Sequence, residues 1–228
     1  MKKKILYTGI EPCETLNNAE VFHLPLISMK RRSLSIKETK DVFDHIYSYS
    51  HILFTSKYAV QSFFLCMKEL NIPKEYLDPV FLLAIGSSTL KALEKEGVYI
   101  NYVGSDETEE GAIRLLESLD LKDAKLLLPQ AGMTRAKLIH YLVEKGVFYD
   151  VIILYDLFKQ KPYEAIDLKN FDEIIFTSPV AVDAFFDIYE DLPHTLQVHS
   201  MGMMTRCKLK SYLNDKNKKT GAIHGLGV

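Results

Sequence analysis

The sequence predicts an α/β fold built from two similar halves. Two observations support this prediction: short apolar runs alternate with amphipathic helical stretches, and one pattern occurs twice. Continuous apolar strands are typical of parallel sheets that helices cover on both faces. The pattern ILFTSKYAVQSFF at residues 52–64 returns as IIFTSPVAVDAFF at residues 174–186. Two units of one design imply two lobes, and two lobes imply a cleft in which a ligand can bind.

A second shared element follows each copy of the first. It reads IGSSTLKAL at residues 85–93 and MGMMTRCKL at residues 201–209. In the first pattern, apolar residues recur at helical spacing after Thr-Ser, a typical helix N-cap, and Pro179 suits a first helical position. Each copy therefore predicts a strand followed directly by a helix, with its aromatic residues in the core.

The other elements follow from the same alternation of apolar runs and helical spacing. The expected strands are residues 4–8, 21–27, 51–54, 80–85, 99–103, 125–128 and 151–155, besides the one that opens the second copy. The expected helices are residues 36–47, 86–97, 108–119 and 134–146, with further helices after Ser56 and Ser178. Residues 29–33 break the apolar pattern and are expected to cross from one lobe to the other.

The two halves are not arranged in tandem. The best counterpart of residues 125–155 lies at the start of the chain, in residues 4–27. One lobe would then be inserted into the other, giving two similar flavodoxin-like lobes, each a parallel sheet flanked by helices. A two-stranded hinge would join them and let them open and close on a ligand. The predicted boundaries are 1–28 with 161–228 for lobe 1, 35–153 for lobe 2, and 29–34 and 154–160 for the hinge linkers.

Composition and charge exclude several classes of protein. The chain of 228 residues is 47% hydrophobic and 25% charged, as expected of a soluble globular protein. Its net charge of −2 and the absence of a basic stripe disfavour nucleic-acid binding. The first apolar run is too short for a signal peptide, and no stretch approaches the ~20 apolar residues of a membrane span. We therefore expect a cytoplasmic protein, and nothing in the sequence demands more than a monomer.

The sequence indicates neither a metal site nor a cofactor. The three cysteines form no CxxC pair, which favours reduced core thiols, and the seven histidines show no metal-ligand spacing. The motifs of dinucleotide-binding proteins, P-loop proteins, zincins and hydrolases are all absent. We expect no metal and no cofactor.

Polar residues stand where four predicted strands meet their helices. In open parallel sheets ligands bind beyond the carboxyl ends of the strands, and helix N-termini there attract carboxylate or phosphate. The four candidate anion sites are Thr55-Ser56, Gly86 to Thr89, Thr177-Ser178 and Gly202 to Thr205. Each hydroxyl could instead only cap its helix. Four such sites facing one cleft would suit a ligand that carries many carboxylates.

The order and duplication of these motifs resemble uroporphyrinogen-III synthases. The likeness rests on [IL]FTSxxAVxxFF and [IM]GxxTxxxL in both halves, on the segment from Leu127 to Leu138, and on VIILY at residues 151–155. It covers most of the chain, from Lys4 to about Leu213. The resemblance implies an enzyme that cyclises hydroxymethylbilane, a linear tetrapyrrole with eight carboxylates, to uroporphyrinogen III with inversion of the last ring. It also implies a transient contact with the deaminase that makes this substrate.

The resemblance assigns roles to particular residues. Tyr155 matches a tyrosine placed to donate a hydrogen bond to the leaving hydroxyl, and a phenol stays protonated at neutral pH. The matching substrate-binding positions are Thr55, Ser56, Gly86, Ser88, Thr89, Thr177, Ser178, Gly202 and Thr205. Four cations near the expected strand ends could supplement the backbone donors, or could be solvated surface charges: Lys57, Arg135, Lys137 and Arg206.

The chain also departs from the family pattern. Tyr7-Thr-Gly9 stands where Thr-Arg-Pro is usual, and Gln130-Ala131 stands where Arg-Gly is common, so two cations are missing. The last strand and long helix expected in lobe 1 are absent or rudimentary after Leu213. These departures leave a non-catalytic two-lobed binder of a polycarboxylate or tetrapyrrole as an alternative. A flavodoxin-like regulator or nucleotide binder would need an acidic pocket or a phosphate loop, and the sequence has neither.

Overall fold

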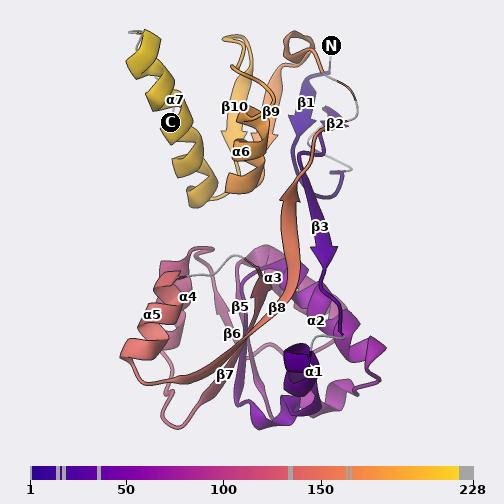
Figure 1. Cartoon of the computed structure of the whole chain (residues 1–228), viewed down its shortest axis with the longest axis vertical. Helices are drawn as coiled ribbons and strands as arrows, with labels where there is room; N and C mark the ends of the chain where they lie inside the picture. Colours follow the sequence, from indigo (N-terminus) through magenta and orange to yellow (C-terminus); the bar gives the residue numbers. More distant parts are fainter. Residues whose placement is uncertain are drawn as a thin grey trace. The chain divides into compact units, whose positions relative to one another are not determined.

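The computed structural model describes residues 2–13, 16, 19–34, 37–132, 136–162, 164 and 166–220. The chain divides into two compact units (Figure 1). Unit 1 comprises Met1–Met29 and Phe158–Val228, and unit 2 comprises Lys30–Leu157. The chain therefore passes between the units twice.

Unit 2 is a layered α/β structure around a six-stranded sheet with the order β3-β8-β7-β4-β5-β6. The pairs from β8 to β6 are all parallel, as predicted for continuous apolar strands. In chain order its elements are β3 (Ile27–Arg31), α1 (Lys37–Asp44), η1 (Ile46–Ser48), β4 (His51–Phe54), α2 (Lys57–Glu69), η2 (Lys74–Leu77), β5 (Phe81–Ile85), α3 (Ser87–Glu96), β6 (Tyr102–Gly104), α4 (Glu109–Glu117), β7 (Lys125–Ala131), α5 (Ala136–Glu144) and β8 (Phe148–Lys159).

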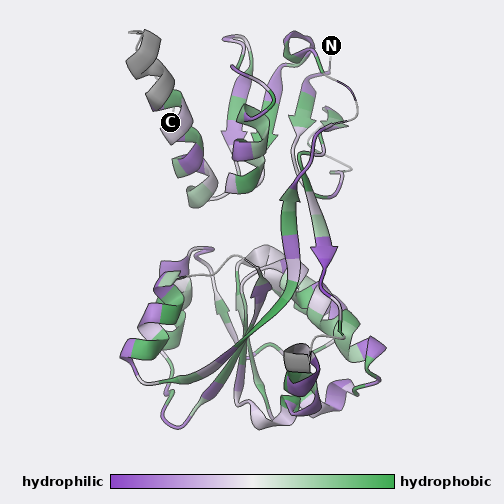
Figure 2. Ribbon diagram, viewed as in Figure 1, coloured by the Kyte–Doolittle hydropathy of each residue, from purple (hydrophilic) through white to green (hydrophobic). Residues whose placement is uncertain are grey.

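Helices cover both faces of this sheet. On one face, α4 and α5 pack against the strands through a core of Leu53, Leu83, Ile85, Ala112, Leu116, Leu126, Leu128, Leu138 and Leu142. On the other face, Phe63 of α2 lies 5.1 Å from the ring of Phe43 and 5.2 Å from the ring of Phe54. These helices carry both hydrophobic and hydrophilic residues (Figure 2), as their spacing predicts. The paired phenylalanines of the FTS pattern are core residues.

Unit 1 is built on a four-stranded parallel sheet with the order β10-β9-β1-β2. Its elements are β1 (Lys4–Tyr7), β2 (Glu20–His23), η3 (Leu168–Asn170), β9 (Glu173–Phe176), α6 (Pro179–Phe186), β10 (Gln197–Ser200) and α7 (Met203–Thr220). Phe176 packs edge-on against Phe185 at 5.2 Å, which repeats the Phe54–Phe63 contact of unit 2. The order of β2, β1, β9 and β10 matches that of β8, β7, β4 and β5.

The units differ in how their sheets are covered. Among the residues that the structure describes, unit 1 has no counterpart of β6, α4 or α5. The sheet face that α4 and α5 would cover borders a cavity of about 1020 Å³, lined in part by Ile5, Tyr7, Ile175 and His199. The shorter lobe expected from the sequence after Leu213 corresponds to this smaller set of elements.

Several element boundaries differ from the sequence-based expectations. The strands expected at 125–128 and 151–155 are longer, since β7 runs to Ala131 and β8 from Phe148 to Lys159. The expected strand at residues 21–27 is two strands, because β2 ends at His23 and Pro25, which has no N–H, precedes β3. The expected break at residues 29–33 begins late, since β3 continues to Arg31. The strand expected at 99–103 is displaced to Tyr102–Gly104.

Candidate functional site

The strongest candidate site in unit 2 lies where the carboxyl ends of β4, β7 and β8 meet. The strands β7 and β4 are neighbours, yet the chain continues from β7 to β8 on one side and from β4 to β5 on the other. Such a reversal of strand order leaves a crevice beyond the strand ends, where ligands of open α/β sheets bind. Ser56, Gln130 and Tyr155 all stand at this edge.

The structure brings Tyr155 and Ser56 together. Tyr155 is only 4% exposed, and its Oη lies 2.8 Å from Oγ of Ser56. Ser56 is the N-cap of α2, and its Oγ also accepts a hydrogen bond from the Ala59 amide at 3.0 Å. The register of β7 and β8 shifts between Gln130 and Ala131, so that Ala131 pairs with Tyr155. This irregularity interrupts the regular β7–β8 ladder one residue before the pair that contains Tyr155.

An ion pair that sequence reasoning missed lies beside Tyr155. Arg32 holds Asp156 by two hydrogen bonds of 2.8 Å, from Nε to Oδ2 and from Nη2 to Oδ1. The Arg32 guanidinium lowers the pKa of Asp156. Gly132 donates its N–H to the Tyr155 carbonyl at 2.9 Å, and a Cβ on this glycine would stand 2.1 Å from Oδ1 of Asp156. Only the fold could reveal this pair, because residues 32 and 156 are far apart in sequence.

The second predicted site of unit 2 is the start of α3. Gly86 caps this helix with φ of 87°, and its N–H donates to the Gly104 carbonyl at 2.8 Å. Thr89 is buried at 1% exposure, whereas Ser88 is exposed. A Cβ on Gly86 would lie 2.5 Å from Oε1 of Glu107. A carboxylate side chain therefore already lies close to the first residue of this helix start.

In unit 1, the predicted residue Thr177 is bonded to strand β1. Its N–H donates to Oγ1 of Thr8 at 3.3 Å, and its Oγ1 donates to the Thr8 carbonyl at 3.2 Å. Thr8, fully buried, donates its own hydroxyl to the Ile175 carbonyl at 3.0 Å. Ser178 caps α6 by accepting from the Ala181 amide at 3.2 Å, and the next residue, Pro179, has no N–H. The start of α6 therefore offers fewer donors to a carboxylate than we expected.

The last predicted site is the start of α7. Gly202 is exposed with φ of 80°, and Thr205 is buried at 3% exposure. Met203 and Met204 between them are exposed. The surface of this helix start is thus apolar, and its threonine contributes to packing.

The predicted cations are mostly engaged or lie elsewhere. Lys137 pairs with Glu110, which raises the pKa of the lysine and lowers that of the glutamate. Lys57 lies over the ring of Tyr58, with Nζ 4.8 Å from the centroid. Arg206 is exposed on α7, and Arg135 lies outside the described residues. Among the described residues of unit 2, steering of the substrate by the predicted cations therefore finds little support.

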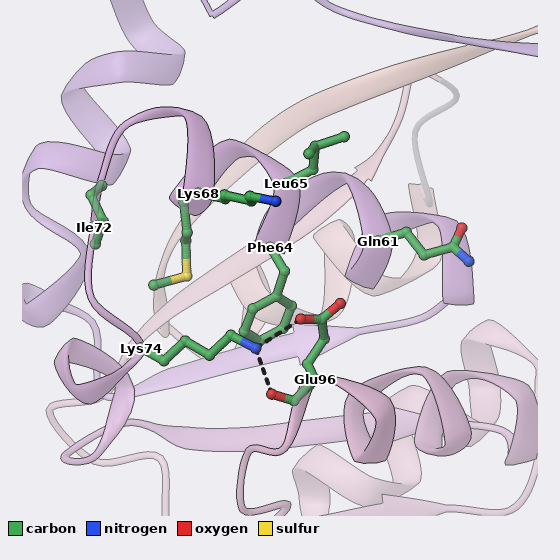
Figure 3. A pocket seen from close by; sticks show the side chains of 8 residues that line it. Gln61, Phe64, Leu65, Lys68, Ile72, Lys74 and Glu96 are labelled. Carbon is green, nitrogen blue, oxygen red and sulfur yellow. Dashed lines mark hydrogen bonds and ion pairs between the residues drawn. The ribbon is translucent and has the colours of Figure 1, made fainter.

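A separate hollow of about 550 Å³ in unit 2 lies away from these residues (Figure 3). It is formed by the later part of α2, the turn at Ile72 and the last residue of α3, Glu96. Lys74 crosses it and pairs with Glu96 at 2.9 Å. None of the predicted site residues lines it, because those residues stand at the starts of the two helices.

The described part of the chain offers neither a metal-binding cluster nor a membrane-spanning helix. No group of three or more His, Cys, Asp or Glu side chains among them could hold a metal ion. No helix in the part of the chain that the structure describes is long and apolar enough to cross a membrane.

Comparisons with known proteins agree on one family. A family model described as uroporphyrinogen-III synthase HemD matches residues 12–214. The chain is also similar to crystal structures of uroporphyrinogen III synthases from Thermus thermophilus and Helicobacter pylori. For a Thermus thermophilus mutant the TM-score is 0.63 at 17% identity, over 92% of this chain and 89% of that chain. For the Helicobacter pylori protein it is 0.59 at 18% identity, over 95% and 90%. A search of curated proteins finds no match.

Proposed function

Because residues 12–214 match that model, the chain belongs to the uroporphyrinogen-III synthase family, and we propose that Tyr155 assists the loss of water in its reaction. Family membership makes the chain an enzyme of tetrapyrrole biosynthesis that converts hydroxymethylbilane into uroporphyrinogen III. The C–O bond of the hydroxymethyl group breaks, the oxygen takes up a proton from solvent and leaves as water, and an azafulvene cation remains; the proton returns to solvent when the closed ring regains its aromatic pyrroles. The terminal ring attacks through its substituted carbon, and the resulting spiro-pyrrolenine breaks and recloses with that ring inverted.

The observation that carries the proposal is the hydrogen-bond chain at the start of α2. The Ala59 amide donates to Oγ of Ser56, which leaves the Ser56 hydroxyl able to donate to Oη of Tyr155, 2.8 Å away. In that arrangement Tyr155 directs its own O–H at the departing hydroxyl of the substrate. The positive end of the α2 dipole favours the electron density that builds on this oxygen. Tyr155 is then a hydrogen-bond donor, and Ser56 is a positioning residue.

Substrate carboxylates would be held by the helix starts on both units. The proposed contacts in unit 2 are Thr55, Ser56, Gly86, Ser88 and Thr89, and those in unit 1 are Thr177, Ser178, Gly202 and Thr205. We further propose that the linkers 29–34 and 154–160 form a hinge between lobes 1–28 with 161–228 and 35–153, so that binding energy can fix one substrate conformation. The working form would be a cytoplasmic monomer that takes its substrate in a transient contact with the preceding deaminase.

The test is isomer analysis of the product. Hydroxymethylbilane is generated in situ, the protein is added, and the oxidised products are separated into the type I and type III isomers. We expect mainly type III from the wild-type protein. Type I alone, formed at the uncatalysed rate, would contradict catalysis and leave a non-catalytic binder of the tetrapyrrole.

Tyr155→Phe tests the proposed role of the phenol. We expect the rate of type III formation to fall about 10- to 100-fold, because one hydrogen bond to the developing charge is lost. Tyr49→Phe is the matched control, since Tyr49 is equally buried at 4% and donates to Asp150 at 2.7 Å on the same sheet, far from the proposed chemistry. An equal loss of rate in both variants would show that Tyr155 acts only through stability.

A further inference from the structure

Gln130 is a buried polar residue that the fold does not use. It is 5% exposed, and its Nε2 makes no hydrogen bond within the described part of the chain. Buried polar groups in native proteins nearly always have a hydrogen-bond partner, and an unpaired one lowers stability. An unpaired amide at this position therefore requires an explanation.

Gln130 occupies a position on β7 where an apolar side chain would be expected. Side chains of a strand alternate between the two faces of a sheet, so residues 126, 128 and 130 share one face of β7. Leu126 and Leu128 lie in the core beneath α4 and α5. A third leucine at residue 130 would continue this apolar row without an unpaired donor. The sequence places a carboxamide there instead.

Gln130 also stands at the same carboxyl edge of the sheet as Tyr155, although the two side chains belong to opposite faces. It pairs with Ile153 on β8, and the register shift that follows it brings the next residue, Ala131, opposite Tyr155. Arg32, the cation described beside Tyr155, already holds Asp156 by two hydrogen bonds. A neutral side-chain donor at this edge would therefore add a contact for a ligand that Arg32 does not supply.

We propose that Gln130 binds the substrate by donating its Nε2–H to a carboxylate of the linear tetrapyrrole at the carboxyl edge of β7, which a ligand of that size reaches from the side of Tyr155. This inference rests on the proposed function and adds a residue that no part of it requires. Residue 130 is 5% exposed as a whole and its Nε2 is buried, so Nε2 must turn outward to meet a carboxylate. Because no hydrogen bond holds Nε2 within the described residues, such a rotation breaks no hydrogen bond donated by this nitrogen. Gln130 would thus contribute to affinity and leave the bond-breaking step to Tyr155.

Gln130→Leu is the decisive variant, because it should weaken substrate binding without lowering the stability of the protein. Leucine removes an unpaired donor from an apolar row, so the thermal midpoint should stay the same or rise. The loss of one hydrogen bond to a charged group should raise KM about tenfold while kcat changes less than about twofold. The product should remain type III.

Two controls match the two properties of Gln130. Ser62→Ala removes another buried polar group that has no partner among the described residues, on α2. Gln61→Leu makes the same substitution on the exposed side of that helix, beside the hollow of Figure 3. Neither should change KM. If the controls raise KM as much as Gln130→Leu does, the effect is general and the proposal is overturned.

A binding measurement separates this proposal from the proposed function. Uroporphyrin III, which carries the eight carboxylates of the product, is titrated into each variant and followed by its fluorescence. About tenfold weaker binding to Gln130→Leu supports the contact even if the wild-type protein forms no type III isomer. Unchanged KM and unchanged uroporphyrin binding overturn it, whatever the isomer analysis shows.

Discussion

Equivalent residues of the two units have taken on different tasks. Ser56 and Ser178 occupy the same place in the repeated FTS pattern, and both cap their helices through the N–H three residues ahead. Ser56 also makes a second side-chain contact, to Tyr155. In unit 1 the neighbouring threonine is bonded to Thr8 instead. Both copies of the repeat keep a serine as the helix N-cap. The residues around each serine determine whether its hydroxyl also contacts another side chain such as Tyr155.

The two serines permit a direct test of this division. Ser178→Ala should lower the free energy of unfolding by about 1 kcal/mol, the usual value of an N-cap, and, because Ser178 is proposed only to hold a substrate carboxylate, raise KM while kcat stays within about threefold. Ser56→Ala should lower stability by at least as much and also reduce kcat about tenfold, because Tyr155 loses its orienting partner. Urea unfolding and the isomer assay measure both quantities. Equal kinetic losses in the two variants would contradict a special role for Ser56.

At the scale of elements, α7 is held to α6 by a charged contact. Asp183 of α6 receives a hydrogen bond from Tyr212 at 2.7 Å and an ion pair from Lys208 at 2.9 Å. Burial opposes the charge on Asp183, but Lys208 and Tyr212 outweigh it and lower the pKa of Asp183. The bond to Asp183 in turn raises the pKa of Tyr212 to about 12, so the phenol remains a donor at neutral pH. Lys159 adds a further positive charge near this carboxylate.

This contact predicts acid sensitivity in unit 1. A carboxyl group whose pKa is lower in the folded state stabilises the protein at pH above its unfolded value, near about 3.9, and the effect is lost as pH falls through the folded pKa. Asp183→Asn keeps the shape and removes the charge. We expect its urea midpoint to lie below that of the wild type at pH 7, with the difference shrinking below about pH 4. A difference that stays constant from neutral pH to about pH 3 would contradict this assignment.

For the whole molecule, the sequence predicted the α/β class and the family correctly, because apolar runs, caps and helical stripes are local patterns. The Phe54 and Phe176 positions in the cores followed from the same patterns. The pairings that build the site are not local. Thr8 meets Thr177 only because β1 and β9 are neighbours, and Gln130 is recognisable as unpaired only once its surroundings are known. The residue types predicted which strand ends carry polar side chains. Only the structure shows which of those side chains already hydrogen-bond to other parts of the chain.

The smaller set of elements in unit 1 predicts that the two units unfold separately. Phe54 and Phe176 are fully buried and make the same 5.2 Å edge-on contact, with Phe63 and with Phe185, in separate cores. Phe54→Leu should lower the stability of unit 2 alone, and Phe176→Leu that of unit 1 alone, each by about 1–3 kcal/mol. Unit 1 should unfold first, because its described residues include no counterparts of α4 and α5 to cover one face of its sheet.

Hydrogen exchange followed by mass spectrometry during urea unfolding can assign each transition to its unit. The expected result is that peptides of β1, β9 and α6 lose protection at lower urea than those of β4, β7 and α2. Phe176→Leu should shift only the first group, and Phe54→Leu only the second, since a cavity acts on the core that contains it. If both substitutions shift one common transition equally, the two cores unfold as a single cooperative unit, which contradicts separate unfolding of the two units.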